Sequence, residues 1–188
     1  MPIPSANATP HALDSVLVLD PEGREVRLGT LWANHTAVLL FVRHFGCLFC
    51  GQQVADIAPF VNGIRDAGAE LFVIGNGSVD QARAFRDRHT LTMPLFTDPD
   101  RQAFRALGMR SGAGTVLHPS VIARSLAALK AGFRQSRVAG DPFQLGGVVV
   151  IGVDGVERYR YVSRFAGDHP DPAAILRHCR SVSPDLSE

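Results

Sequence analysis

The sequence predicts an α/β domain in which helices flank a central mixed β-sheet. Apolar runs that suit buried strands alternate with segments of helical periodicity along most of the 188 residues. Near the C-terminus, two strand-like segments at 146–155 and 156–165 are joined by an Asp154-Gly155 turn and predict an antiparallel hairpin. No internal repeat and no linker marks a second domain.

The order of the elements follows from the apolar pattern. Before the hairpin, strands are predicted over 15–20, 24–29, 37–45, 70–76 and 94–98. Helices are predicted over 50–64, 78–89, 98–108, 119–135 and 171–180. The run at 37–45 is a continuous apolar strand, which is typical of a strand buried on both faces of a sheet.

Local signals refine three of the helices. Pro59 lies inside the helix over 50–64 and predicts a kink, because proline lacks a backbone donor. Ser78 and Gln81 have the spacing of a capping box. Asp171 is the expected N-cap of the last helix. In the helix over 50–64, the polar residues fall mostly off the apolar face; they are Gln52, Gln53, Asp56 and Asn62.

A single domain is predicted over residues 15–180. Residues 1–14 are interpreted as a loose lead-in and residues 181–188 as a C-terminal tail. The stretch 109–145 breaks the strand–helix rhythm and is interpreted as a helical insertion before the hairpin. Between 110 and 140 it carries five basic residues and no acidic one. This pattern favours a solvated helix face and loop over the alternative, a docking surface for an anionic substrate or partner.

Composition narrows the classes of function. Apolar residues make up 46% and charged residues 20%, the profile of an ordinary globular protein. The formal net charge of +1 gives no general attraction to nucleic acid or to a membrane surface. The apolar runs are too short to span a bilayer, and residues 1–15 lack the pattern of a signal peptide. These observations favour a cytoplasmic protein without nucleic-acid or membrane partners.

The chemistry is expected at Cys47 and Cys50, which form a C-x-x-C pair where a buried strand gives way to a helix. The N–H groups at a helix start favour a thiolate, and the thiolate is the reactive form. Arg43 and His44 come just before the pair and can add positive charge. In a cytosolic chain this arrangement indicates a redox dithiol.

Two other interpretations of the pair are open. In the first, the cysteines simply fill the core, because free cysteine is often buried and Cys50 lies on the apolar face of its helix. A zinc site would need about four ligands, and His178-Cys179 is the only candidate partner. Neighbouring helix residues point apart, so we predict no metal site. We also predict no flavin and no nucleotide cofactor. Cys179 is expected to be a half-buried helix residue rather than a third redox thiol.

Three segments resemble a known superfamily; they are RHFGCLFC (43–50), PLFTDPDRQAFRALGM (94–109) and QLGGVVVIGVDG (144–155). The resemblance is to the alkyl hydroperoxide reductase/thiol-specific antioxidant superfamily, above all to its peroxiredoxin-like branch with the prostamide/prostaglandin F synthase group. It spans about residues 15–180 and implies a thioredoxin-like fold. It also implies a peroxide or related oxidised substrate, a thioredoxin- or glutathione-like electron donor, and the option of a homodimer.

The resemblance is incomplete at the site. Peroxiredoxins carry a proline, a threonine and the peroxidatic cysteine at a fixed spacing, and these positions hold Arg43, Cys47 and Cys50 here. The arginine that peroxiredoxins place beside the sulfur is replaced by Gly146 and Gly147. A peroxidase would therefore need a substitute for this arginine, such as Arg43 or a backbone amide.

The order of attack stays open. In a peroxidase of this kind, Cys50 would be oxidised to a sulfenic acid and Cys47 would condense with it. In a disulfide reductase, Cys47 would attack and Cys50 would resolve the mixed disulfide. We expect a thiol oxidoreductase that cycles this pair to reduce a small oxidised substrate. The alternatives are a general protein disulfide reductase and a non-catalytic redox-sensing or binding module.

Overall fold

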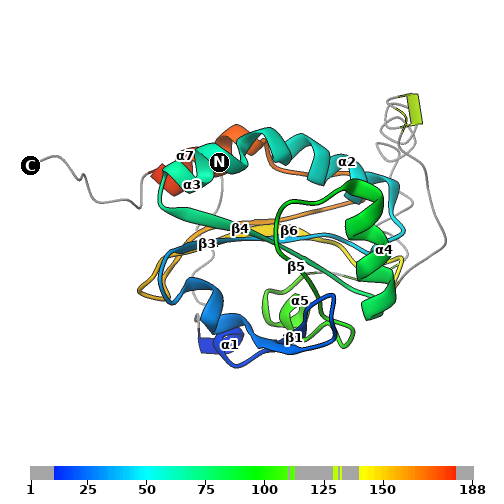
Figure 1. Cartoon of the computed structure of the whole chain (residues 1–188), viewed down its shortest axis with the longest axis horizontal. Coiled ribbons are helices and arrows are strands. Elements are labelled where there is room, and N and C mark those ends of the chain that lie inside the picture. The colour runs from blue at the N-terminus through cyan, green and yellow to red at the C-terminus, as the bar shows by residue number, and fades with distance from the viewer. Residues whose placement is uncertain (1–10, 110, 113–128, 131, 133–139, 181–188) are drawn as a thin grey trace, which may run out of the picture.

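A seven-stranded mixed sheet forms the centre of the protein (Figure 1). The computed structural model describes residues 11–109, 111–112, 129–130, 132 and 140–180. The strands are β1 (Leu17–Leu19), β2 (Glu25–Arg27), β3 (Thr36–Phe41), β4 (Ala69–Gly75), β5 (Leu95–Thr97), β6 (Gly147–Ile151) and β7 (Glu157–Val162). They lie in the order β2-β1-β5-β4-β3-β6-β7.

The centre of the sheet is parallel and its two ends are antiparallel. β3 pairs in parallel with β4, and β4 with β5. β6 runs antiparallel to β3, with Val38 opposite Val150, and it forms the predicted hairpin with β7. Residues 152–156 connect the two strands, and Gly155 has a φ of 74°, a conformation that glycine adopts without strain. The α/β fold with a mixed sheet is thus confirmed.

Helices cover both faces of the sheet. The α-helices are α1 (His11–Asp14), α2 (Leu48–Ile57), α3 (Val61–Asp66), α4 (Val79–His89), α5 (Gln102–Ala106) and α7 (Pro172–Arg180). One face packs against α2, α3, α4 and α7, and the opposite face packs against α1, α5 and the 3-10 helix Leu28–Trp32 (Figure 1). The capping box at Ser78 and Gln81 is present at the start of α4.

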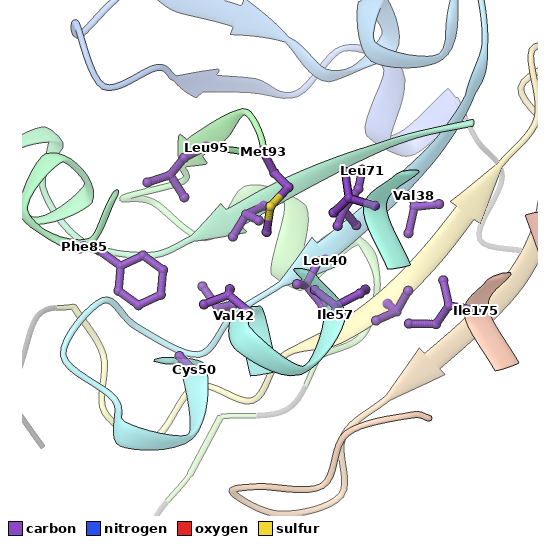
Figure 2. Packing of buried hydrophobic residues seen from close by; sticks show 14 of the residues in the cluster. Val38, Leu40, Val42, Cys50, Ile57, Leu71, Phe85, Met93, Leu95 and Ile175 are labelled. Carbon is purple, nitrogen blue, oxygen red and sulfur yellow. The ribbon is translucent and has the colours of Figure 1, made fainter. Parts of the chain in front are cut away.

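Side chains of the central strands alternate between two cores. On β3, Val38 and Leu40 face the helices α2 and α7, and Leu39 faces the opposite core. Figure 2 shows Leu40 beside Ile57, with Ile175 of α7 on the same side of the sheet. A strand covered on both faces needs apolar residues at every position, which explains the continuous apolar run in the sequence.

Two details differ from the sequence prediction. The strand expected over 37–45 ends at Phe41, and the chain then leaves the sheet to enter α2. Gln53, expected off the apolar face of its helix, is only 6% exposed. It lines a cavity of about 30 Å³ with Asp56 and His169, because the segment before α7 packs over this part of α2.

The kink at Pro59 is confirmed. The predicted helix divides into α2, a 3-10 turn over Ala58–Phe60, and α3. The expected lead-in over 1–14 ends in the short helix α1, where Leu13 is buried in the core; residues 1–10 and 181–188 lie outside the described residues. Most of the helix predicted over 119–135 lies outside them too. Of the helices that are described, none is both long and apolar enough to cross a membrane.

Candidate redox site

The cysteine pair lies at the junction of β3 and α2. After Phe41, the Val42 N–H still donates to the Ile74 carbonyl of β4 at 2.8 Å, and the chain then turns away from the sheet. The Cys47 N–H donates to the His44 carbonyl at 3.1 Å and closes this turn. Cys47 is the N-cap residue of α2, so its side chain lies at the helix start, where backbone N–H groups are exposed.

The two sulfurs differ in depth. Both cysteines are free thiols; Cys47 is 5% exposed and Cys50 is completely buried. Figure 2 shows Cys50 in the first turn of α2, on the side of this helix that faces Val42 and Phe85. The sequence interpretation of Cys50 as a core residue is therefore correct for its packing, and Cys47 is the member of the pair nearer to solvent.

Arg43 holds its guanidinium against the Cys47 sulfur. Its Nη1 donates to Cys47 Sγ at 3.4 Å, and its Nε donates to the Gln144 carbonyl at 3.0 Å. Its Nη2 donates to the Pro142 carbonyl. Arg43 is only 5% exposed, so each nitrogen that has left water is compensated by an acceptor, as a buried charge requires. This contact supplies the positive charge beside the pair.

The surroundings shift the pKa values of the two thiols in opposite directions. The pKa of Cys47 is lowered by a hydrogen bond from the Cys50 side chain, with further contributions from the charge of Arg43 and from the N–H groups of Cys50 and Phe49, against the opposing effect of burial. The pKa of Cys50 is raised well above its usual value, first by burial and then by its interaction with Cys47. Of the two thiols, Cys47 is therefore the one whose surroundings favour the thiolate.

His44 does not add the positive charge expected from the sequence. Burial, followed by the neighbouring charge of Arg43, lowers the pKa of His44 to about 4, so the ring is neutral at pH 7. Its Nδ1 accepts a hydrogen bond from the Gly46 N–H at 3.2 Å, which shapes the turn before Cys47. His44 is 3% exposed, so little water can stabilise a charged ring, and the adjacent Arg43 charge opposes a second positive charge.

Gly146 and Gly147 contribute space rather than a polar group. A Cβ on Gly146 would lie 2.0 Å from the Phe41 carbonyl oxygen, and one on Gly147 would lie 2.2 Å from the Tyr161 carbonyl oxygen. These residues let β6 approach its neighbours closely where the segment that binds Arg43 joins the sheet.

Three polar residues that the sequence analysis missed complete the site. Asn76 donates from Nδ2 to the Arg43 carbonyl, and its Oδ1 accepts from the Asp141 N–H at 2.7 Å. Gln144 is 2% exposed and supplies one of the carbonyls for Arg43. Asn76 follows β4 at the carboxyl end of a parallel strand next to β3, and that position was a signal for a site residue. No sequence signal pointed to Asp141 and Gln144, about 100 residues from Arg43 along the chain.

The site shows no arrangement for a metal. In the part of the chain that the structure describes, no three His, Cys, Asp or Glu side chains come together as a metal site would require. Cys179 lies on α7, is fully buried rather than half-buried, and has its pKa raised by burial to about 11. A thiol in that environment is protonated at neutral pH and does not act as a nucleophile.

The fold and the cysteine pair together define a thioredoxin-fold protein with a C-x-x-C pair at the start of a helix. The chain belongs to the AhpC/TSA antioxidant enzyme family, whose model matches residues 56–164, more than half of its length. This confirms the superfamily resemblance found in the sequence. The matched residues begin after Cys50, so the assignment of the site depends on its geometry.

Curated relatives extend the comparison over most of the chain. The chloroplastic thioredoxin-like protein AAED1 of Arabidopsis thaliana is 32% identical over 91% of this chain and 73% of its own. Peroxiredoxin-like 2C of Mus musculus is 29% identical over 88% and 78%. The human prostamide/prostaglandin F synthase is 25% identical over 82% and 80%. The chain is therefore peroxiredoxin-like, as its sequence predicted.

Solved structures confirm the fold class. The bacterioferritin comigratory protein of Xanthomonas campestris superposes with a TM-score of 0.67 at 15% identity, covering 94% of this chain and 97% of that one. The peroxidoxin BcpB of Mycobacterium tuberculosis gives a TM-score of 0.66 at 15% identity, with coverages of 90% and 94%. At this identity the likeness concerns the thioredoxin-like fold alone.

Proposed function

We propose that the protein is a thiol oxidoreductase that reduces a peroxide or a related small oxidised molecule, with Cys47 as the attacking thiolate and Cys50 as the resolving thiol. The observation that carries this proposal is the contact between the Arg43 guanidinium and the Cys47 sulfur, beside a completely buried Cys50. Family membership supports the peroxide as the substrate class. The order of attack is the reverse of the one that the peroxiredoxin spacing suggested.

The proposed reaction has three steps. The Cys47 thiolate attacks one peroxide oxygen, the O–O bond breaks, and the other oxygen leaves and takes a proton from water, so that Cys47 becomes a sulfenic acid. Oxidation removes the negative charge of Cys47, which helps to keep the proton on Cys50. The Cys50 sulfur then attacks Cys47 and passes its proton to the sulfenic hydroxyl, which forms the disulfide and releases water. A thioredoxin- or glutathione-like donor then supplies two electrons and two protons and restores both thiols. Arg43 stabilises the thiolate before the attack.

Depth favours a small substrate over a protein disulfide. Cys47 is 5% exposed as a residue, so a peroxide can reach it with less displacement of the surrounding chain than a protein disulfide needs. The human relative is named for the synthesis of prostamide and prostaglandin F, so an organic peroxide belongs beside hydrogen peroxide in the first assays. We also propose a cytoplasmic location, because reduced thiols persist there.

The decisive experiment follows the masses of reduced wild type, Cys47→Ser and Cys50→Ser after a slight excess of peroxide. Wild type should lose two hydrogens as the disulfide forms. Cys50→Ser should gain one oxygen at Cys47, and Cys47→Ser should stay unmodified. Cys179→Ser is the matched control and should react as wild type does. A sulfenic acid trapped at Cys50 in Cys47→Ser would contradict the proposed order.

A redox-sensing module is the second candidate, favoured by the lack of open access to either sulfur. A sensor oxidises once for each molecule, whereas an enzyme turns over. Peroxide consumption in the presence of thioredoxin, thioredoxin reductase and NADPH separates the two, and glutathione with its reductase tests the other donor. Consumption that stops after one equivalent would favour the sensor.

Size-exclusion chromatography in both redox states tests the expected homodimer.

A further inference from the structure

The Pro142 and Gln144 carbonyls, here called the carbonyl pair, hold two of the three nitrogens of Arg43. Their position depends on Asp141. One oxygen of its carboxylate, Oδ1, accepts from the Phe143 N–H at 2.8 Å, and its backbone carbonyl accepts from the Gln144 N–H at 3.3 Å. The side chain of Asp141 thus closes a turn around the residues that carry the carbonyl pair.

Arg101 anchors this turn to the body of the fold. Its Nη1 forms an ion pair with Asp141 Oδ2, which also accepts from Ser111 Oγ at 2.9 Å. The side chains of Arg101 and Asp141 are 35% and 22% exposed, so the pair is only partly screened by water. The contact joins residues 40 positions apart and connects the start of α5 to the site.

The backbone of Arg101 is in an unfavourable conformation. Its φ of 57° and ψ of 34° lie in the left-handed region, which is disfavoured for a residue other than glycine. Asp98 enforces this conformation, because its side chain accepts from the N–H groups of Gln102 at 3.0 Å and Ala103 at 2.8 Å. Such strain persists where the surrounding contacts require it, and here it brings the guanidinium to Asp141.

Asn76 provides a second connection to the same place. It accepts from the Asp141 N–H and donates to the Arg43 carbonyl, so it links the turn at Asp141 to the backbone of the residue that contacts Cys47. Nothing larger than glycine fits at position 140, where a Cβ would lie 2.0 Å from Asn76 Oδ1. Arg43 is thus positioned from both its backbone and its guanidinium.

We propose that Arg101 and Asp141 are positioning residues of the redox site: their ion pair holds the carbonyl pair in place, and the carbonyl pair aims the Arg43 guanidinium at the Cys47 sulfur. This inference rests on the proposed role of Cys47 as the attacking thiolate. It adds to that role a charged pair at the surface that acts on the sulfur only through Arg43.

Positioning and plain electrostatics predict different outcomes. Loss of the Arg101 charge would raise the pKa of Cys47 by either route. Loss of the Asp141 charge would lower that pKa if only direct electrostatics acted, because a negative charge disfavours a thiolate. It would raise the pKa if the ion pair positions Arg43. Among the residues that the structure describes, Arg43 contacts Cys47, the charge of Asp141 acts on the neighbouring His44, and Arg101 pairs with Asp141. His44 is neutral, and burial favours the protonated form of Cys50.

The test measures the pH dependence of iodoacetamide alkylation at Cys47, located by peptide mass spectrometry, in Arg101→Asn and Asp141→Asn. Asparagine tolerates left-handed backbone, so Arg101→Asn removes the guanidinium without new strain. We expect both variants to raise the apparent pKa by about half a unit, roughly a threefold loss of thiolate below the pKa. Arg101→Lys should recover part of the loss.

Two comparisons complete the design. In an Arg43→Met background, neither substitution should move the pKa further, and Arg158→Asn, which removes the exposed ion pair with Asp154, should leave it unchanged. The proposal would be overturned if the apparent pKa of Cys47 moved in opposite directions in Arg101→Asn and Asp141→Asn, or did not move. It would also be overturned if the two substitutions moved that pKa as much in the Arg43→Met background as in wild type. Alkylation needs neither peroxide nor donor, so a failure of the proposed peroxidase activity would be seen separately, as absent turnover in wild type.

Discussion

At the scale of single residues, the buried Arg43 guanidinium adds to the Cys50 hydrogen bond in favouring a thiolate at Cys47. Two of its nitrogens bind backbone carbonyls, and the third faces Cys47. A charge-assisted hydrogen bond is stronger than a neutral one, above all where water is excluded. Cys50 is fully buried and donates a hydrogen bond to Cys47, and both effects raise its pKa and favour the thiol.

Replacing Arg43 with methionine should raise the pKa of Cys47. Methionine keeps part of the buried stem and removes the charge. At pH 5, below the Cys47 pKa of about 6, we expect alkylation of Cys47 to slow by about tenfold, which corresponds to one pKa unit. Competitive alkylation with mass spectrometry measures the rate at each cysteine. Arg65→Met, which removes an exposed ion pair with Glu70, is the matched control. An unchanged rate in Arg43→Met would show that Cys50 and the helix start, rather than Arg43, set the reactivity of Cys47.

The sequence allowed prediction of the cysteine pair and of Arg43, because both follow from spacing near a strand end. It did not allow prediction of the carbonyl pair, since backbone carbonyls carry no sequence signal and lie 99 and 101 positions from Arg43. The sequence allowed a positive charge on His44, but burial lowers the pKa of this residue to about 4, and the local sequence does not encode that packing.

At the scale of the elements, α4 packs against the first turn of α2 through a histidine and a glycine. A Cβ on Gly51 would lie 2.5 Å from His89 Cε1, and the His89 ring is held 4.6 Å from the Phe85 ring. The cysteine-bearing helix can approach α4 at this distance only with glycine next to Cys50.

Gly51→Ala should therefore destabilise the fold, although alanine is the better helix former. Crowding of this kind typically costs about 1–3 kcal/mol. Adding His89→Ala should remove the clash and leave the helix-propensity gain of about 1 kcal/mol visible. Urea denaturation of the two single variants and the double variant measures the coupling. Additive effects would indicate that His89 moves aside without cost.

Element boundaries show what the apolar pattern can and cannot predict. The kink at Pro59 and the capping box at Ser78 were predicted, because each depends on one or two residues. The end of β3 was predicted too late, at residue 45 rather than at Phe41, because Val42 and Phe45 are buried in the core after the chain has left the sheet. Apolar burial continues there while strand pairing stops.

At the scale of the whole molecule, the sheet order explains why the site is assembled from distant segments. β3 lies between β4 and β6, so the turn after β3 meets Asn76 after β4 and Gln144 before β6. The α/β class and the hairpin were predictable from element order, and the thioredoxin-like fold from family resemblance. The pairing of β3 with both neighbours joins residues far apart in sequence, which local patterns do not encode.

Stability should depend on pH through His44. Its pKa is about 4 in the folded state and near 6.5 when exposed, so between these values the unfolded chain binds more protons. The free energy of unfolding should fall as pH drops from about 6.5 to about 4, by up to roughly 3 kcal/mol from this residue. His44→Asn keeps an acceptor for the Gly46 N–H and should flatten the slope in chemical denaturation. Equal slopes in both proteins would contradict the burial of a neutral His44.

The contact between Arg43 and Cys47 also bears on the balance between the two oxidation states. The dithiol form gives the buried guanidinium an anionic neighbour, whereas a disulfide carries no charge. Arg43 therefore favours the reduced pair, which should give it a less negative reduction potential. Arg43→Met should shift that potential downward by about 30 mV for each tenfold loss of preference, as measured by titration against glutathione. An unchanged potential would contradict this balance. The feature that prepares Cys47 to attack thus also makes the oxidised pair easy for an electron donor to reduce.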